Sequence, residues 1–130
     1  MKYYKDDGKE NINETKPRES SIENALKEID AFPITEGNFI GFINEKDETI
    51  QFHKNEEDAW VLDVPVVENG YFIYSLTDDD LTTEKVKSIV KKFFLGENWR
   101  YLCSLTKLQE QKQKEEYQKL LENGNGNNSH

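Results

Sequence analysis

Four short apolar runs, separated by connectors of only five or six residues, constrain the fold of this chain more than any other feature. The runs are rich in β-branched and aromatic residues, as strands are, and they occupy 39–43, 49–53, 59–64 and 71–76. A parallel crossover needs roughly a dozen residues or more, so connectors this short predict antiparallel pairing. The sequence therefore predicts a four-stranded antiparallel meander.

The second run indicates how the two faces of this sheet differ. Ile50 and Phe52 alternate with Gln51 and His53, and successive side chains of a strand point to opposite faces. We therefore expect one face of the sheet to be buried and the other to be at least partly in contact with water.

A helix is predicted on each side of the four runs. Ser20 begins a capping-box sequence for the first helix, and Pro33 ends it. Thr82 or Thr83 is expected to cap the second helix, and Gly96 to end it. Each helix carries one apolar stripe, formed by Ile22, Ala25, Leu26 and Ile29 in the first and by Val86, Ile89, Val90, Phe93 and Phe94 in the second.

The order of elements, α-β-β-β-β-α-α, predicts an α+β fold in which helices pack on one face of the sheet. The last helix is expected over 107–122, where strong helix formers include only a few apolar residues, namely Leu108, Tyr117, Leu120 and Leu121. A helix this polar is predicted to be solvated, lightly docked or bound to a partner.

The two ends of the chain are predicted to lie outside the folded domain. Residues 1–20 carry five basic and five acidic side chains with few large apolar ones, so we expect a flexible arm. Residues 123–130 are rich in Asn and Gly, which predicts a disordered tail. The α+β domain is therefore expected to span 21–106, followed by the polar C-terminal helix at 107–122.

Charge excludes several functions. The 17 Lys+Arg and 26 Asp+Glu give a net charge of −9, and residues 36–80 hold 12 acidic groups against only Lys46 and Lys54. A nucleic-acid binder needs a basic surface to replace the counterions of phosphates, and an anionic membrane repels a surface of this sign. We therefore expect neither nucleic acid nor membrane as a partner. A single cysteine and a polar start without a signal-like apolar region predict a cytoplasmic protein.

No residue pattern indicates catalysis or a cofactor. His53 is expected on the solvated face of its strand, and Cys103 in a buried, unreactive run of aromatic and aliphatic residues. The chain lacks the Cys and His spacing of a zinc site and the glycine-rich loop of a phosphate site. We expect no metal, no cofactor and no enzymatic activity, and a small hydrolase that uses His53 or Cys103 is the alternative ranked last.

Six carboxylates are predicted to gather at one end of the sheet, because they follow strands that end at the same edge of a meander. They are Glu56, Glu57, Asp58, Asp78, Asp79 and Asp80. Proteins commonly place charges in loops, and that interpretation stays open beside a functional one. The functional interpretation is an acidic docking surface, because clustered charge of one sign speeds association with a basic partner.

Residues 22–105 contain, in order, a leading helix, strands at 38–43, 49–52, 60–64 and 71–74, and a helix at 83–96 that leads into Glu97-Asn98-Trp99. This order resembles small bacterial immunity proteins of polymorphic-toxin and contact-dependent inhibition systems. The resemblance implies a non-catalytic protein that neutralises a cognate toxin domain by tight one-to-one binding.

The leading hypothesis is therefore an antitoxin-like protein whose acidic edge covers the basic active site of a toxin, for example a nuclease. Tyr71, Tyr74 and Trp99 are the candidate aromatic anchors of the interface. The protein is expected to be a monomer or a weak dimer. The alternative is a structural or adaptor module that binds its partner through the 107–122 helix.

Overall fold

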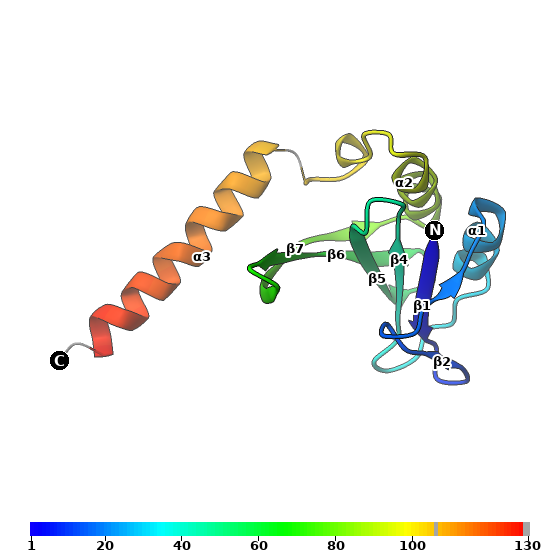
Figure 1. Cartoon of the computed structure of the whole chain (residues 1–130), viewed down its shortest axis with the longest axis horizontal. Coiled ribbons are helices and arrows are strands. Elements are labelled where there is room, and N and C mark those ends of the chain that lie inside the picture. Colours follow the sequence, from blue (N-terminus) through cyan, green and yellow to red (C-terminus); the bar gives the residue numbers. More distant parts are fainter. Residues whose placement is uncertain (106, 129–130) are drawn as a thin grey trace.

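The computed structural model describes residues 1–105 and 107–128. In this part of the chain, three α-helices accompany a seven-stranded antiparallel sheet (Figure 1). Strands β2, β1, β4, β5, β6 and β7 are neighbours in that order, and β3 also pairs with β1. The fold is α+β, as the sequence predicts, but its sheet is larger than the predicted one.

The predicted four-stranded meander forms the main part of this sheet. β4 (Phe39–Ile43), β5 (Thr49–Glu56), β6 (Ala59–Glu68) and β7 (Tyr71–Leu81) each pair with the next strand along the chain. β6 and β7 are longer than predicted, because their pairing continues past Pro65 and through polar residues. The four-strand prediction thus describes this part and omits three strands that precede it.

Residues 1–20 form three strands, so the prediction of a flexible arm is wrong. β1 (Lys2–Asp6) pairs along its whole length with β4, while β2 (Asn11–Ile12) and β3 (Arg18–Glu19) pair with β1. Tyr3 is buried as a result. Apolar residues are few here, but pairing with β4 satisfies the backbone and lets those few enter the core.

Local signals place the helix ends. Ser21, one residue later than predicted, caps the first helix by accepting the N–H of Asn24. Thr82 caps the second helix by accepting the N–H of Lys85. Gly96 ends that helix with a φ of 72°, a left-handed conformation that glycine adopts without steric cost.

The core lies between two helices, α1 (Ile22–Asp30) and α2 (Thr83–Leu95), and the sheet face that they cover (Figure 1). The ring of Phe94 from α2 meets Phe42 of β4 edge-on, with 5.7 Å between the ring centroids. Side chains at the centre of the covered face are inaccessible to water, and the exposed fraction is 0% for Ile40, Phe42, Phe52, Trp60 and Leu62. Each such side chain contributes about 1.5–3 kcal/mol through burial.

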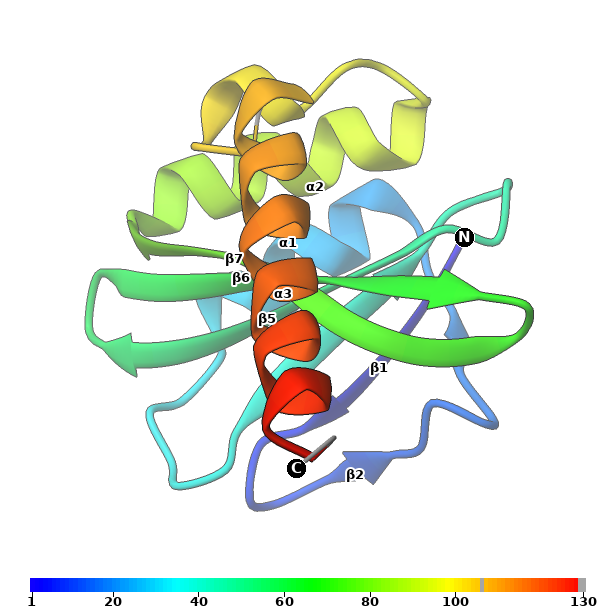
Figure 2. The ribbon, with the colours of Figure 1, turned by 90° about the vertical axis from the view of Figure 1, so that its left-hand side faces the viewer.

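A short 3-10 helix, η1 (Arg100–Leu102), leads to α3 (Lys107–Asn128), which projects away from α1 and α2 and crosses the β6–β7 pair (Figures 1 and 2). The ring of Tyr117 in α3 stacks on Tyr74, with 4.5 Å between centroids. α3 includes most of the segment predicted to be a disordered tail, and residues 129–130 of that tail lie outside the described residues. Of the helices described, none combines the length and apolar character needed to cross a membrane.

Candidate functional site

The sheet face opposite α1 and α2 carries a row of residues across four neighbouring strands. Tyr4 of β1 lies opposite Gly41 of β4, Gly41 opposite Gln51 of β5, and Gln51 opposite Asp63 of β6. Directly opposed residues project from the same face of a sheet. Strand pairing therefore brings residues from distant parts of the sequence together on this side, which we call the open face.

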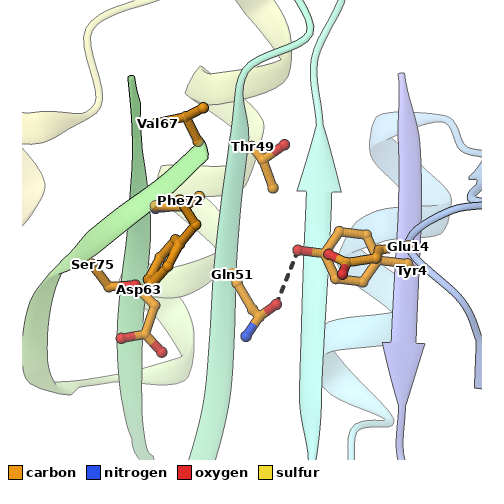
Figure 3. Close-up of a pocket in the computed structure, with 9 residues that line it drawn as sticks. Tyr4, Glu14, Thr49, Gln51, Asp63, Val67, Phe72 and Ser75 are labelled. Carbon is orange, nitrogen blue, oxygen red and sulfur yellow. Dashed lines mark hydrogen bonds between the residues drawn. The ribbon is translucent and has the colours of Figure 1, made fainter. Parts of the chain in front are cut away.

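Tyr4 is held on the open face by its fit over Gly41. A Cβ atom at Gly41 would lie 2.0 Å from Cζ of Tyr4, so the ring needs a glycine beneath it. The Tyr4 hydroxyl reaches across β4 and donates a hydrogen bond of 3.0 Å to Oε1 of Gln51 (Figure 3). Burial and, to a smaller extent, the charge of Glu14 raise the pKa of Tyr4, so its phenol remains a neutral donor.

A hollow of about 530 Å³ opens beside this row (Figure 3). Its polar lining consists of hydroxyl, amide and carboxylate groups of Tyr4, Glu14, Thr49, Gln51, Asp63 and Ser75. Val67 and Phe72, from the β6–β7 hairpin, add exposed apolar surface. The hollow therefore combines two carboxylates with aromatic surface, and its described lining contains no cationic side chain.

Asp63 joins the hollow to His53, which lies on the partly solvated face as predicted. Oδ2 of Asp63 lies 3.3 Å from Nδ1 of His53. Burial raises the pKa of Asp63, and the interaction with His53 opposes that shift. A hydrolase of the Ser-His-Asp type would place a nucleophile on the far side of the histidine. The depression beside His53 contains no serine or cysteine among its described lining residues.

The predicted gathering of six carboxylates follows from the register of β6 and β7. Trp60 lies opposite Leu81 and Leu62 opposite Asp78, so the end of β7 lies beside the start of β6. Asp78 is half-buried and the other five side chains are exposed. We call the group the acidic end, and it consists of Glu56, Glu57, Asp58, Asp78, Asp79 and Asp80.

Two lysines, Lys54 and Lys85, lie near the acidic end. Hydrogen bonds and, to a smaller extent, the charge of Lys54 lower the pKa of Asp58. Among the side chains that the structure describes, none forms an ion pair with any of the six carboxylates. Lys54 is buried, and its Nζ donates to the carbonyl of Phe32 and lies 5.4 Å from the ring centroid of Trp60. Lys85 lines the same depression as residues 78–80 but is not paired with them.

Two members of the acidic end also stabilise the fold. Oδ1 of Asp58 accepts the N–H of Thr83 at 2.8 Å, in the first turn of α2, and this hydrogen bond lowers the pKa of Asp58. Oδ2 of Asp78 accepts the N–H of Ser104 at 3.0 Å. These contacts fix both ends of the group, while the other four carboxylates face water.

The three predicted aromatic anchors do not gather at the acidic end. Tyr71 is 76% exposed, but the register places it at the β6–β7 hairpin, at the other end of the sheet. Tyr74 is covered by Tyr117 of α3. Trp99 is buried, with an exposed fraction of 8%. Of the three, only Tyr71 is open to a partner.

The structure offers little reactive chemistry at the remaining candidates. Cys103 is half-buried, and burial raises the pKa of its thiol, which keeps it protonated and a weak nucleophile. Among the described residues, no three His, Cys, Asp or Glu side chains are placed to hold a metal ion.

Comparison with known proteins gives no relative: no family model matches the chain, and neither does any curated protein or solved structure. The open face and the acidic end are therefore the features that bear on function.

The sequence predicts the acidic end but not the hollow. Tyr4 and Glu14 belong to the segment predicted to be a flexible arm, so neither was considered beside the strands. One signal was available, because a glycine inside a strand, here Gly41, often marks the close approach of another group.

Proposed function

We propose that this chain is a non-catalytic binding protein that meets a basic protein partner with its acidic end, as immunity proteins do when they neutralise a cognate bacterial toxin. The partner would be a toxin domain with a basic active site, such as that of a nuclease, in which carboxylates take the place of phosphate charges. The observation that carries the proposal is the unpaired acidic end.

Several carboxylates elsewhere in the protein are paired with a cation. Lys5 lies 2.9 Å from both Asp7 and Glu28, and Lys87 lies 3.1 Å from Asp30. The acidic end differs because six carboxylates lie together with no ion pair among the described side chains, although like charges held together repel one another and disfavour the compact state. Binding of a basic partner relieves the repulsion among the six carboxylates, so such a partner explains why the protein keeps them together.

The acidic end also has the properties that fast association requires. Its outer carboxylates are exposed, and Asp58 and Asp78 are fixed to the fold through Thr83 and Ser104. A fixed field of one sign steers an oppositely charged partner and raises association rates by about 10- to 1000-fold. For an inhibitor, a high association rate limits the time during which its target is active.

The direct test has two parts: the proposal expects a toxin domain encoded beside the gene for this chain, and it expects the chain to protect cells from that domain. Bacterial cells that express the domain alone should stop growing, and co-expression of the full chain should restore growth. The purified pair should form a one-to-one complex, and its association rate constant should fall as the salt concentration rises. Cells that die whether or not the chain is present would contradict the proposal.

A set of charge variants isolates the acidic end. Replacement of its four unanchored members, Glu56→Gln, Glu57→Gln, Asp79→Asn and Asp80→Asn, should slow association at low salt by about tenfold or more. Asp80 has a φ of 59°, which asparagine also tolerates, so the backbone should not change. The matched control changes net charge equally at exposed sites elsewhere, with Glu19→Gln, Asp47→Asn, Glu116→Gln and Glu122→Gln. If both sets slowed association equally, the association rate would depend on net charge alone and not on the acidic end.

A second candidate function is an adaptor that binds through α3. Its support is the exposure of two neighbouring leucines, with Leu120 exposed by 70% and Leu121 by 49%, whereas Tyr117 of the same predicted stripe stacks on Tyr74. A Leu120→Ser, Leu121→Ser variant separates the two functions. Loss of binding in this variant, with full binding after neutralisation of the acidic end, would favour the adaptor.

A further inference from the structure

The hollow on the open face contains a carboxylate, that of Asp63, in which only one of the two oxygens has a partner among the described residues. The side chain of Asp63 is 20% exposed, and its Oδ2 pairs with His53. Within the described residues, its Oδ1 accepts no hydrogen bond and stays accessible from the hollow, so it can accept from a ligand. A second carboxylate, from Glu14, lies on the other side of Gln51 (Figure 3). The hollow therefore offers acceptors to a ligand that brings donors and positive charge.

The aromatic surface of the hollow adds a second, independent preference. Phe72 is 63% exposed and lines the same hollow as Asp63 (Figure 3). A hollow that offers both an exposed ring and a carboxylate suits a group that is flat, cationic and attached to an apolar stem. Lysine and arginine side chains both have such a stem, but only the guanidinium of arginine is planar and stacks on an aromatic face.

We infer that the hollow receives an arginine side chain of the protein partner, with the guanidinium donating to Asp63 and stacking on Phe72 while Glu14 supplies the second negative charge. This inference rests on the proposed function for the basic character of the partner. It adds a point of specificity: the acidic end attracts positive charge of any kind, whereas the hollow selects one side chain by shape and by directed hydrogen bonds.

The test uses a small probe and the full-length chain, and it does not require the toxin. The probe is N-acetyl-arginine N-methylamide, which carries the guanidinium and no other charge. Titration into ¹⁵N-labelled protein should shift the amide signals of Gln51, Asp63 and Ser75 in a saturable way. The citrulline analogue, in which a neutral urea replaces the guanidinium, should bind about tenfold more weakly or worse. The lysine analogue should bind several-fold more weakly than arginine.

Variants locate the site. Asp63→Asn should weaken the arginine probe by about tenfold, and Glu14→Gln and Phe72→Ala by about threefold each. Glu14 and Phe72 are exposed, so these two variants remain informative even where Asp63→Asn perturbs the fold. Asp79→Asn, a matched loss of charge at the acidic end, should leave probe affinity unchanged.

Three results would overturn the inference: equal binding of the citrulline and arginine probes, equal binding of the lysine probe, or shifts that centre on the acidic end. Its failure is distinguishable from failure of the proposed function. Protection from the toxin without probe binding would leave the acidic end as the interface and remove the arginine site. Probe binding without protection would keep the site and remove the toxin as the partner.

Discussion

The two faces of the sheet are formed by the same strands but have opposite properties. On β5, Phe52 points to the covered face and is 0% exposed, while its neighbour Gln51 points to the open face and lines the hollow. The covered face contributes most of the apolar burial that stabilises the fold. The open face contributes polar groups that a partner can reach. Because successive side chains of a strand point to opposite faces, one residue stabilises the fold and the next can contact a partner.

One part of the open face breaks this division. Tyr4 has an exposed fraction of only 3%, although it lies on the face without helices. The ring is buried by its fit over Gly41 and by its hydrogen bond to Gln51. The comparison of faces therefore predicts three kinds of substitution effect, which differ in size and in sign.

The largest effect is expected on the covered face. Trp60→Ala should lower the free energy of unfolding by about 3–5 kcal/mol, because it leaves a large cavity and removes the hydrogen bond from Nε1 to Oγ1 of Thr83. Phe72→Ala, an aromatic truncation on the open face, should change it by less than about 0.5 kcal/mol. Urea unfolding of both variants checks the contrast, and equal losses would remove the distinction between the faces.

An intermediate effect is expected at Gly41. Gly41→Ala should cost about 1–3 kcal/mol, because the new Cβ would collide with the Tyr4 ring. In a Tyr4→Ala background the same change should cost much less, since the ring is gone. A double-mutant cycle measured by urea unfolding isolates the coupling. A cost that is independent of Tyr4 would place the strain elsewhere.

The smallest effects are expected from two Asp→Asn changes of opposite sign. The backbone N–H of Glu10 and the ammonium of Lys5 lower the pKa of Asp7 to about 2, although partial burial opposes this. Asp7→Asn should therefore cost about 1–2 kcal/mol at pH 7. Burial instead raises the pKa of Asp63, so Asp63→Asn should raise stability at pH 7, by less than Asp7→Asn lowers it.

The pH dependence distinguishes the two changes further. The ordinary pKa of both groups is 3.8. Asp7 contributes stability above that value, and the contribution disappears as the pH falls through about 2. The ionised form of Asp63 disfavours the fold, so its cost appears as the pH rises above 3.8 through the raised pKa. For each variant, the difference in free energy of unfolding from the wild type can be measured from acidic to neutral pH. The two differences should change with pH in opposite directions, and changes in the same direction would contradict these environments.

The meander and the helices were predictable because their signals are local. Apolar alternation at 49–53, short connectors and helix caps each act over a few residues. The grouping of the acidic end was predictable for a related reason, since alternate connectors of a meander emerge at the same edge of the sheet. The register of Leu62 opposite Asp78 confirms that placement.

Other residues could not be placed from their neighbours in the sequence. Tyr74 and Trp99 looked like exposed anchors, but Tyr117 covers the first and packing buries the second. Residues 1–20 have the composition of a flexible segment, and their strands depend on pairing with β4. The covering of Tyr74 and the strands of residues 1–20 have no local signal, because Tyr117 and β4 lie far from them along the chain.

By itself, the sequence determined the α+β class, the order of the central strands and the end of the sheet where negative charge collects. Each depends on periodicity or on connector length, which constrain the backbone over short distances. Only the tertiary structure decided that Tyr4 lies over Gly41 and that Glu14 and Asp63 line one hollow. These placements depend on the register between distant segments, which is set by the packing of the whole sheet.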